Sequence, residues 1–337
     1  MADKNKIVPG NVEGNFFVDT TCINCDTCRA IAPSVFGEYG DYAGVKKQPA
    51  NKEEHRLAMR ALLCCPVGSI GTHEPNNARE VLQDFPLVID RNVYFCGFNS
   101  PKSAGGFSYL VIHSLGNWMI DAPRFNPAVV DFLERNGGLK YIFLTHKDDC
   151  AEQAKYAEKF GAKRIIHEKE IEAVPDAEMV LEGFGPIHIE EDFTIIPQPG
   201  HTEGHCMLLY DNKFLFSGDV FTCNRYFDGL NIFPPLWTWY SYEQSISSVE
   251  ALRNYSFEWI LPGHGRKMHR TFDEMQEQLE KAIVKGREVK DEPSPERLTN
   301  LLYYARSMEE GHMPIAAEKV RARARLMSEQ LGLITQA

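Results

Sequence analysis

The sequence lacks any long apolar run and has little positive charge. No stretch of its 337 residues approaches the ~20 apolar residues that a membrane-spanning helix needs. Lys and Arg number 36 against 47 Asp and Glu, and the net charge of -11 argues against binding to a nucleic-acid backbone. The first residues have neither the apolar core of a signal peptide nor the Arg and Ser of a transit peptide. We therefore expect a soluble cytoplasmic protein that binds neither nucleic acid nor membrane.

The nine cysteines are unevenly placed along the chain. Cys22, Cys25 and Cys28 follow one another at three-residue steps, and Cys65 stands before a proline. Three thiolates at this spacing and a remote Cys-Pro can bind one 4Fe–4S cluster. Zinc sites more often use paired Cys-x-x-Cys arms, and a secreted disulfide framework does not fit this pattern. The four cysteines are the predicted cluster ligands.

The segment around these cysteines, about residues 14 to 73, resembles single-cluster bacterial-type ferredoxins, and the likeness includes the APSVF stretch after Cys28. Two-cluster ferredoxins carry a further cysteine four positions after the third, where this chain has Ala32. The resemblance therefore implies one cluster in a small α+β domain, which we place at residues 1–75. Cys64, beside a predicted ligand, is interpreted as a packed thiol.

From residue 85 the pattern changes to short apolar runs rich in β-branched and aromatic residues. A turn signal at Gly116-Asn117 predicts a hairpin between two of these runs. Asn126 and Pro127 are typical of a helix start, and strands and helices then alternate. This order predicts an α/β domain with mixed sheets at residues 76–270. Residues 271–337 read as a charged helical extension that packs on the core or on a second subunit, as in a homodimer.

Four motifs place histidine or aspartate in Gly- or Asp-rich loops just past expected strands. Three imidazoles and two or more carboxylates that converge make a good site for divalent metal ions. The four motifs are residues 145–150, 199–205, 217–219 and 262–265.

In this order the motifs resemble the metallo-β-lactamase fold, especially its glyoxalase-like branch, over about residues 85 to 270. The resemblance implies an αββα sandwich that holds one or two divalent ions, zinc or iron, at one edge. It implies that His146 and His201 bind the first metal, that Asp219 bridges, and that His264 binds the second. Asp121 would brace the site from behind.

The leading motif of that family, His-x-His-x-Asp-His, is altered here. Asp148 replaces the second histidine and can still bind a metal, directly or through water. Cys150 stands at the aspartate position, where we interpret it as a buried small residue, and Ala151 cannot replace the last histidine. Asp149 could take the aspartate role if the loop shifts by one residue. His205 matches a histidine of the PGHTxGH turn that is not a ligand.

Three functions remain open from the sequence. The first is hydrolysis of an ester, thioester or phosphoester, in which Asp148 or Asp149 orients or deprotonates a metal-bound water. The second is a redox reaction at non-haem iron fed by the cluster, since Asp148 resembles the carboxylate in the leading motif of flavodiiron proteins. The third is a non-catalytic redox sensor. A small-molecule substrate and a redox partner protein are expected.

An aromatic segment, residues 231–244, bears on all three functions. It could line a substrate pocket or pack as a loop against the C-terminal helices.

Overall fold

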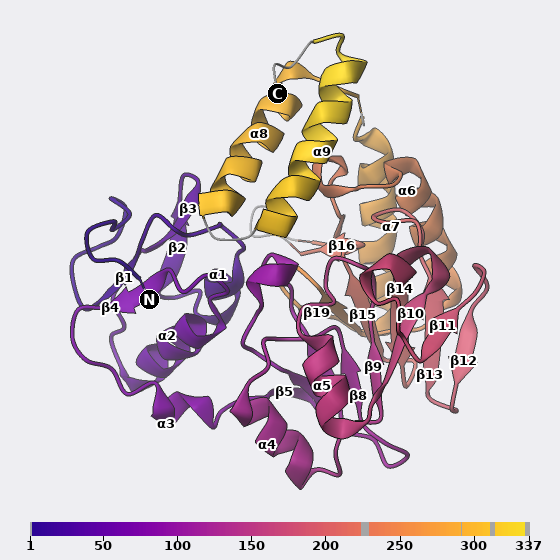
Figure 1. The fold of residues 1–337 in the computed structure, drawn as a ribbon, viewed down its shortest axis with the longest axis horizontal. Coiled ribbons are helices and arrows are strands. Elements are labelled where there is room, and N and C mark those ends of the chain that lie inside the picture. Colours follow the sequence, from indigo (N-terminus) through magenta and orange to yellow (C-terminus); the bar gives the residue numbers. More distant parts are fainter. Residues whose placement is uncertain (1, 224–228, 291, 311–313, 334–337) are drawn as a thin grey trace.

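The computed structural model describes residues 2–223, 229–290, 292–310 and 314–333. In sequence order these residues form a small N-terminal part, a two-sheet sandwich and a helical C-terminal part (Figure 1). No helix in this part of the chain is long and apolar enough to cross a membrane.

The N-terminal part has its own core of buried apolar side chains, among them Phe16, Phe36 and Met59. Helix α2 begins after Asn51, whose side chain accepts a hydrogen bond from the backbone N–H of Glu54, and such a cap satisfies a backbone donor that the helix itself leaves free. The β1–β4 and β2–β3 pairs are antiparallel. The elements are β1 (Phe16–Val18), α1 (Thr27–Ile31), β2 (Phe36–Tyr39), β3 (Tyr42–Val45), α2 (Lys52–Cys64), β4 (Ile70–Thr72) and α3 (Arg79–Leu82).

The first sheet of the sandwich has seven strands in the order β11-β10-β9-β8-β7-β6-β5. Strands β8 to β11 are parallel neighbours, whereas β5 to β8 are antiparallel. The strands are β5 (Leu87–Asp90), β6 (Val93–Phe95), β7 (Tyr109–Val111), β8 (Trp118–Ile120), β9 (Tyr141–Phe143), β10 (Lys163–His167) and β11 (Met179–Leu181). Helices α4 (Pro127–Arg135) and α5 (Gln153–Phe160) place Val129, Leu133 and Tyr156 in the core of this sheet.

The second sheet has six strands in the order β12-β13-β14-β15-β18-β19. Its strands are β12 (Ile187–Ile189), β13 (Phe193–Pro197), β14 (Cys206–Tyr210), β15 (Phe214–Gly218), β18 (Trp259–Pro262) and β19 (Met268–His269); β16 (Phe221–Thr222) and β17 (Asn231–Ile232) form a separate pair. The two sheets meet through aromatic side chains, as in the Trp118–Phe193 stack with ring centroids 4.3 Å apart. Helices α6 (Tyr242–Glu250) and α7 (Phe272–Glu288) cover its other face.

The C-terminal helices α8 (Pro295–Glu310) and α9 (Pro314–Gln330) pack as a pair and stand over the junction between the N-terminal part and the sandwich (Figure 1). Leu298, Leu301 and Val320 are among their shared buried side chains. Trp237 and Trp239 pack against this cluster. The helical extension expected from the sequence is present, and it lies on the core of its own chain.

Local features of the sandwich also match the sequence-based expectations. Strands β7 and β8 form the predicted hairpin, and Gly116 at its turn has a positive φ of 121°. Asn126 caps helix α4, because its side chain accepts a hydrogen bond from the Ala128 N–H, and Pro127 is the first residue of the helix.

Candidate metal centre

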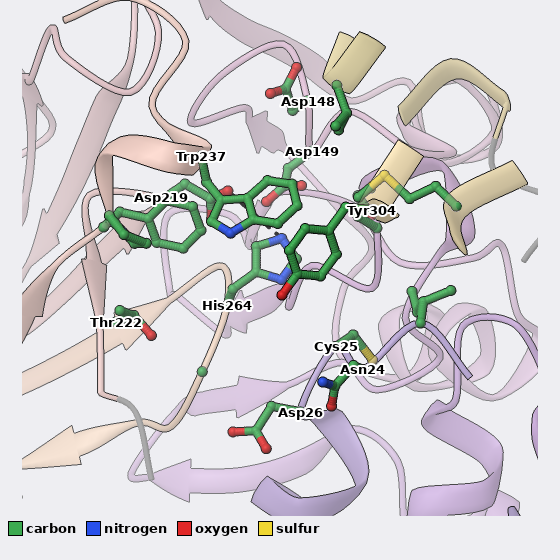
Figure 2. Close-up of a pocket in the computed structure, with 18 of the residues that line it drawn as sticks. Asn24, Cys25, Asp26, Asp148, Asp149, Asp219, Thr222, Trp237, His264 and Tyr304 are labelled. Carbon is green, nitrogen blue, oxygen red and sulfur yellow. Dashed lines mark ion pairs between the residues drawn. The ribbon is translucent and has the colours of Figure 1, made fainter. Parts of the chain in front are cut away.

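The predicted metal ligands come together at one edge of the sandwich, in loops that follow β9, β13, β15 and β18. Figure 2 shows Asp148, Asp149, Asp219 and His264 in one pocket. The turn before Asp219 needs glycine, because Gly218 has a φ of +47° and an added Cβ would lie 2.5 Å from Nε2 of His205. Short loops thus present side chains from distant strands to the same point.

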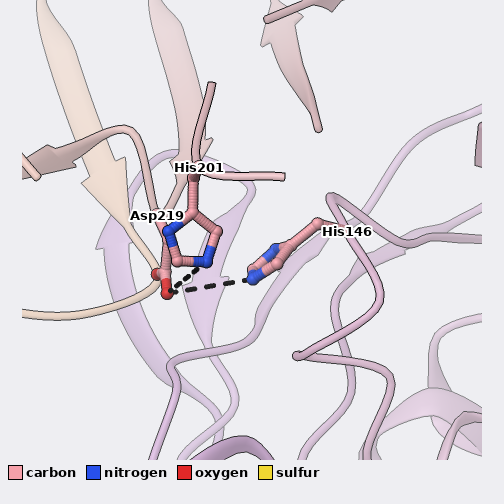
Figure 3. A group of neighbouring side chains, drawn as sticks. All are labelled: His146, His201 and Asp219. Atoms are coloured by element: carbon pink, nitrogen blue, oxygen red, sulfur yellow. Dashed lines mark ion pairs between the residues drawn. The ribbon is translucent and has the colours of Figure 1, made fainter. Parts of the chain in front are cut away.

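His146, His201 and Asp219 form one group that could hold a metal ion (Figure 3). Asp219 Oδ2 lies 3.8 Å from His146 Nε2 and 3.7 Å from His201 Nε2. Both imidazole nitrogens are buried without a hydrogen-bond partner among the described residues. Burial and the neighbouring His201 lower the pKa of His146 well below its usual value. Buried polar atoms that converge without partners suit a bound cation, which would satisfy them.

Asp149, Asp219 and His264 form a second group, and it shares Asp219 with the first. His264 Nε2 lies 3.7 Å from Asp219 Oδ2. Burial, together with the charge of Asp219, raises the pKa of Asp149 well above its usual value. A cation would relieve this repulsion between buried carboxylates. Asp149, one residue before the family position, is therefore the carboxylate that the structure brings to this group.

Asp148 lies beside the first group in a different environment. Its Oδ2 is 3.5 Å from His201 Nε2 and 3.9 Å from His146 Nε2, and it accepts a hydrogen bond of 2.8 Å from Trp239 Nε1. Its Oδ1 pairs with Lys319 of α9. Burial opposes ionisation, but His201, His146 and Lys319 together hold the pKa of Asp148 well below its usual value. Asp148 is therefore an anion that faces both histidines.

Asp121 braces the centre through Thr145. The Asp121 carboxylate accepts hydrogen bonds of 2.9 Å from the Thr145 N–H and 3.0 Å from its hydroxyl, and that hydroxyl lies 2.9 Å from His146 Nδ1. His205 Nε2 accepts a 3.1 Å hydrogen bond from the Asp219 N–H. Such contacts fix the orientation of ligands from behind. The contacts of Asp121 are those of a residue that braces the site, as the resemblance implied, and His205 belongs to neither ligand group.

The altered end of the leading motif contributes no ligand to either group. Cys150 is buried, and its thiol donates to the His146 carbonyl at 3.6 Å. Ala151 adopts a positive φ of 39°, which turns the chain into α5. Lys319 carried no sequence signal, because it lies 171 positions from Asp148. Trp239 belongs to the aromatic segment identified in the sequence, but its contact with Asp148 was not predicted.

The four predicted cluster cysteines line one small cavity of the N-terminal part. Backbone N–H groups of Asn24 and Ala43 donate to Cys22 Sγ at 3.4 Å, and that of Ser69 donates to Cys65 Sγ at 3.3 Å. Four converging sulfurs with backbone N–H donors fit an iron–sulfur cluster. Cys64 is fully buried and packs in the core of the sandwich instead.

A cavity of 480 Å³ joins the two regions. Its walls include Cys25 from the cluster-binding segment and Asp149, Asp219 and His264 from the metal centre (Figure 2). The aromatic segment contributes Phe233, Pro234, Trp237 and Trp239, and the C-terminal helices contribute Tyr304, Met308, Lys319 and Val320. Both interpretations of the aromatic segment therefore hold, since it lines the pocket and packs on the helices.

Comparison with known proteins supports this two-part organisation. Residues 18–72 match the model of the 4Fe-4S single cluster domain of ferredoxin I. The hydroxyacylglutathione hydrolase of Cereibacter sphaeroides is 30% identical over 141 residues, which cover 40% of this chain and 52% of that protein. The beta-lactamase-like protein 2 homolog of Caenorhabditis elegans is 26% identical over 163 residues, 46% of this chain and 52% of that protein. The chain thus spans about half the length of these relatives.

Solved structures of metallo-β-lactamases are also similar. The DIM-1 metallo-β-lactamase exposed to ceftazidime has a TM-score of 0.48 and 18% identity, and the match covers 59% of this chain and 95% of that one. A metallo-β-lactamase family protein from Thermus thermophilus has a TM-score of 0.47 and 15% identity, with 73% and 95% covered.

The sandwich of two mixed sheets between helices, together with the curated relatives, defines a protein of the metallo-β-lactamase fold. The chain joins this fold to an N-terminal part that matches a single-cluster 4Fe–4S ferredoxin domain and to C-terminal helices. The fold class predicted from the sequence is confirmed.

Proposed function

We propose that the protein hydrolyses a small-molecule ester, thioester or phosphoester at a divalent metal centre. The observation that carries this proposal is the pair of ligand groups that share Asp219 on the wall of the 480 Å³ cavity. His146 and His201 would hold one ion, and Asp149 and His264 the other. Bound ions would polarise the scissile group and lower the pKa of a water molecule toward neutrality.

The surrounding residues have separate roles in this proposal. Asp148 is ionised and faces the first group, so it can accept a hydrogen bond from the attacking water and orient it. The Lys319 ammonium and the Trp239 N–H hold Asp148 in that direction. Phe233 and Trp237 offer an apolar wall for the organic part of the substrate.

The test is metal analysis of protein prepared without oxygen, followed by hydrolysis assays with thioester, ester and phosphodiester substrates. We expect zinc-dependent turnover that does not change when the cluster is oxidised. His201→Ala should abolish metal binding in the sandwich and keep the visible absorbance of the cluster. His188→Ala, which alters an exposed histidine on β12, is the matched control and should keep both. A zinc-loaded protein without turnover on any of these substrates would contradict the proposal.

A redox reaction at iron is the second candidate, and one observation favours it. Cys25 and Asp149 line the same cavity, so a redox-active ion near Asp149 would lie close to the cluster. Carboxylate-rich ligation also suits iron. This candidate would be favoured over the hydrolase if the sandwich contains iron and the spectroscopic signal of that iron changes when electrons are supplied through the cluster.

A further inference from the structure

The loop of residues 99–107 runs between the cluster-binding segment and the metal centre. On the cluster side, the Asn99 side chain donates to the Gly105 carbonyl at 2.6 Å and lies 3.4 Å from the Thr27 hydroxyl, which is itself 3.3 Å from Cys25 Sγ. A Cβ added to Gly105 would lie 3.3 Å from Cys25 Sγ. Gly105 therefore packs directly against a predicted cluster ligand.

The next residue packs against the metal centre. A Cβ added to Gly106 would lie 2.7 Å from Asp149 Oδ1, and the following N–H, from Phe107, donates to the Gly263 carbonyl at 2.7 Å. Because consecutive Cα atoms are ~3.8 Å apart, Cys25 Sγ and Asp149 Oδ1 lie within about 13 Å of each other. Two adjacent residues, Gly105 and Gly106, thus pack against a sulfur of the cluster site and a carboxylate of the metal site.

The two sites are separated by protein and by the cavity, and the carboxylates of the metal centre that face the cavity are buried. Asp149 and Asp219 are buried, and aromatic side chains line the cavity beside them. Buried charges are screened by salt much less than exposed ones, and an effective dielectric constant of about 20 describes their interaction. A change of one charge at the cluster is therefore felt by a divalent ion at Asp149.

We propose that the two sites, which Gly105 and Gly106 hold close together, are coupled electrostatically, so that the redox state of the cluster regulates the metal centre. This inference rests on the proposed metal-dependent function. Reduction adds one electron to the cluster, taken from a one-electron donor protein of low potential, and no bond of the substrate changes. The added negative charge strengthens cation binding at Asp149, Asp219 and His264, and it weakens the binding of an anionic ligand in the cavity.

Coupling of this kind is reciprocal, which supplies a test that does not use turnover. If reduction of the cluster raises the affinity for a divalent ion by some factor, binding of the ion must shift the equilibrium toward the reduced cluster by the same factor. The test measures the midpoint potential of the cluster in the whole chain without oxygen, first with the sandwich freed of metal by a chelator and then with zinc added. Zinc has no redox chemistry of its own, so a shift reports electrostatic coupling.

We expect zinc to make the midpoint potential more positive by at least about 59 mV, which corresponds to tenfold tighter zinc binding by the reduced protein. His264→Ala should remove most of the shift, whereas His188→Ala should retain it. Zinc binding with an unchanged potential would overturn the coupling and leave the proposed hydrolase intact. Failure to bind zinc would overturn both proposals.

Discussion

Substitution of Gly106 by alanine offers a direct test of the second ligand group. The backbone of Gly106 is outside the left-handed region, so alanine is not strained there by its own conformation. The added Cβ would instead lie 2.7 Å from Asp149 Oδ1, 2.8 Å from Oδ2 and 3.0 Å from Cγ. The whole Asp149 carboxylate must therefore move away. A second metal ion would depend on this carboxylate as a ligand.

The size of the effect follows from these distances. The carboxylate must move by about 0.7 Å to restore ordinary contact, whereas metal–ligand distances hold within about 0.2 Å. Overpacking of this kind costs about 1–3 kcal/mol of stability, which a domain of this size tolerates. Displaced ligand geometry lowers metal affinity by about 10–100-fold. The group of His146 and His201 should be less affected, because the three atoms nearest the added Cβ all belong to Asp149, which is not in that group.

The assay is zinc stoichiometry and affinity, measured by competition with a chromophoric chelator. We expect the wild type to bind two ions and Gly106→Ala to bind one tightly and one weakly. Gly185→Ala is the matched control, since an added Cβ there meets no atom within 4 Å and its backbone is also compatible with alanine. If Gly106→Ala binds two ions as tightly as the wild type, Asp149 does not hold a metal.

Three further predictions concern other parts of the molecule. Lys319→Met should cost no more than about 1 kcal/mol of unfolding free energy in urea, because the lysine is partly exposed. The same substitution should lower kcat, because Asp148 loses its partner. Lys319→Arg should restore kcat. Cys65→Ala should abolish the visible absorbance of the cluster, whereas Cys64→Ala at the adjacent position should keep it. Burial lowers the pKa of Lys267 to about 8. The unfolded chain therefore binds more protons above that pH, and raising the pH from 7.5 to 9.5 should stabilise the wild type relative to Lys267→Met by about 2 kcal/mol. An equal response of both proteins in thermal unfolding would contradict this.

The sequence predicted the fold and most of the candidate centre, because these depend on local patterns. Short apolar runs, the turn at Gly116 and the start of α4 at Asn126 are each encoded by a few adjacent residues, and the structure has them where expected. The motifs around His146 and His201 are equally local. The domain limits at residues 75 and 270, the cytoplasmic location and a homodimer stay predictions.

What the sequence could not predict depends on contacts between distant segments. Lys319 reaches Asp148 only because α9 packs over the aromatic segment through Trp237 and Trp239, and no spacing rule connects such positions. The proximity of Cys25 to Asp149 likewise depends on the loop that contains Gly105, which neither motif includes.

The choice between Asp148 and Asp149 shows why a one-residue ambiguity needs a structure. Both are adjacent carboxylates in a loop, and the family spacing favours neither as the second-site ligand. The loop turns so that Asp149 points inward to Asp219 and His264, whereas Asp148 points to the first group, Lys319 and Trp239. The pKa values of the two carboxyl groups consequently shift in opposite directions, up for Asp149 and down for Asp148. Two neighbouring carboxylates in such different environments are suited to different tasks, and so we propose Asp149 as a ligand and Asp148 as the residue that orients the attacking water.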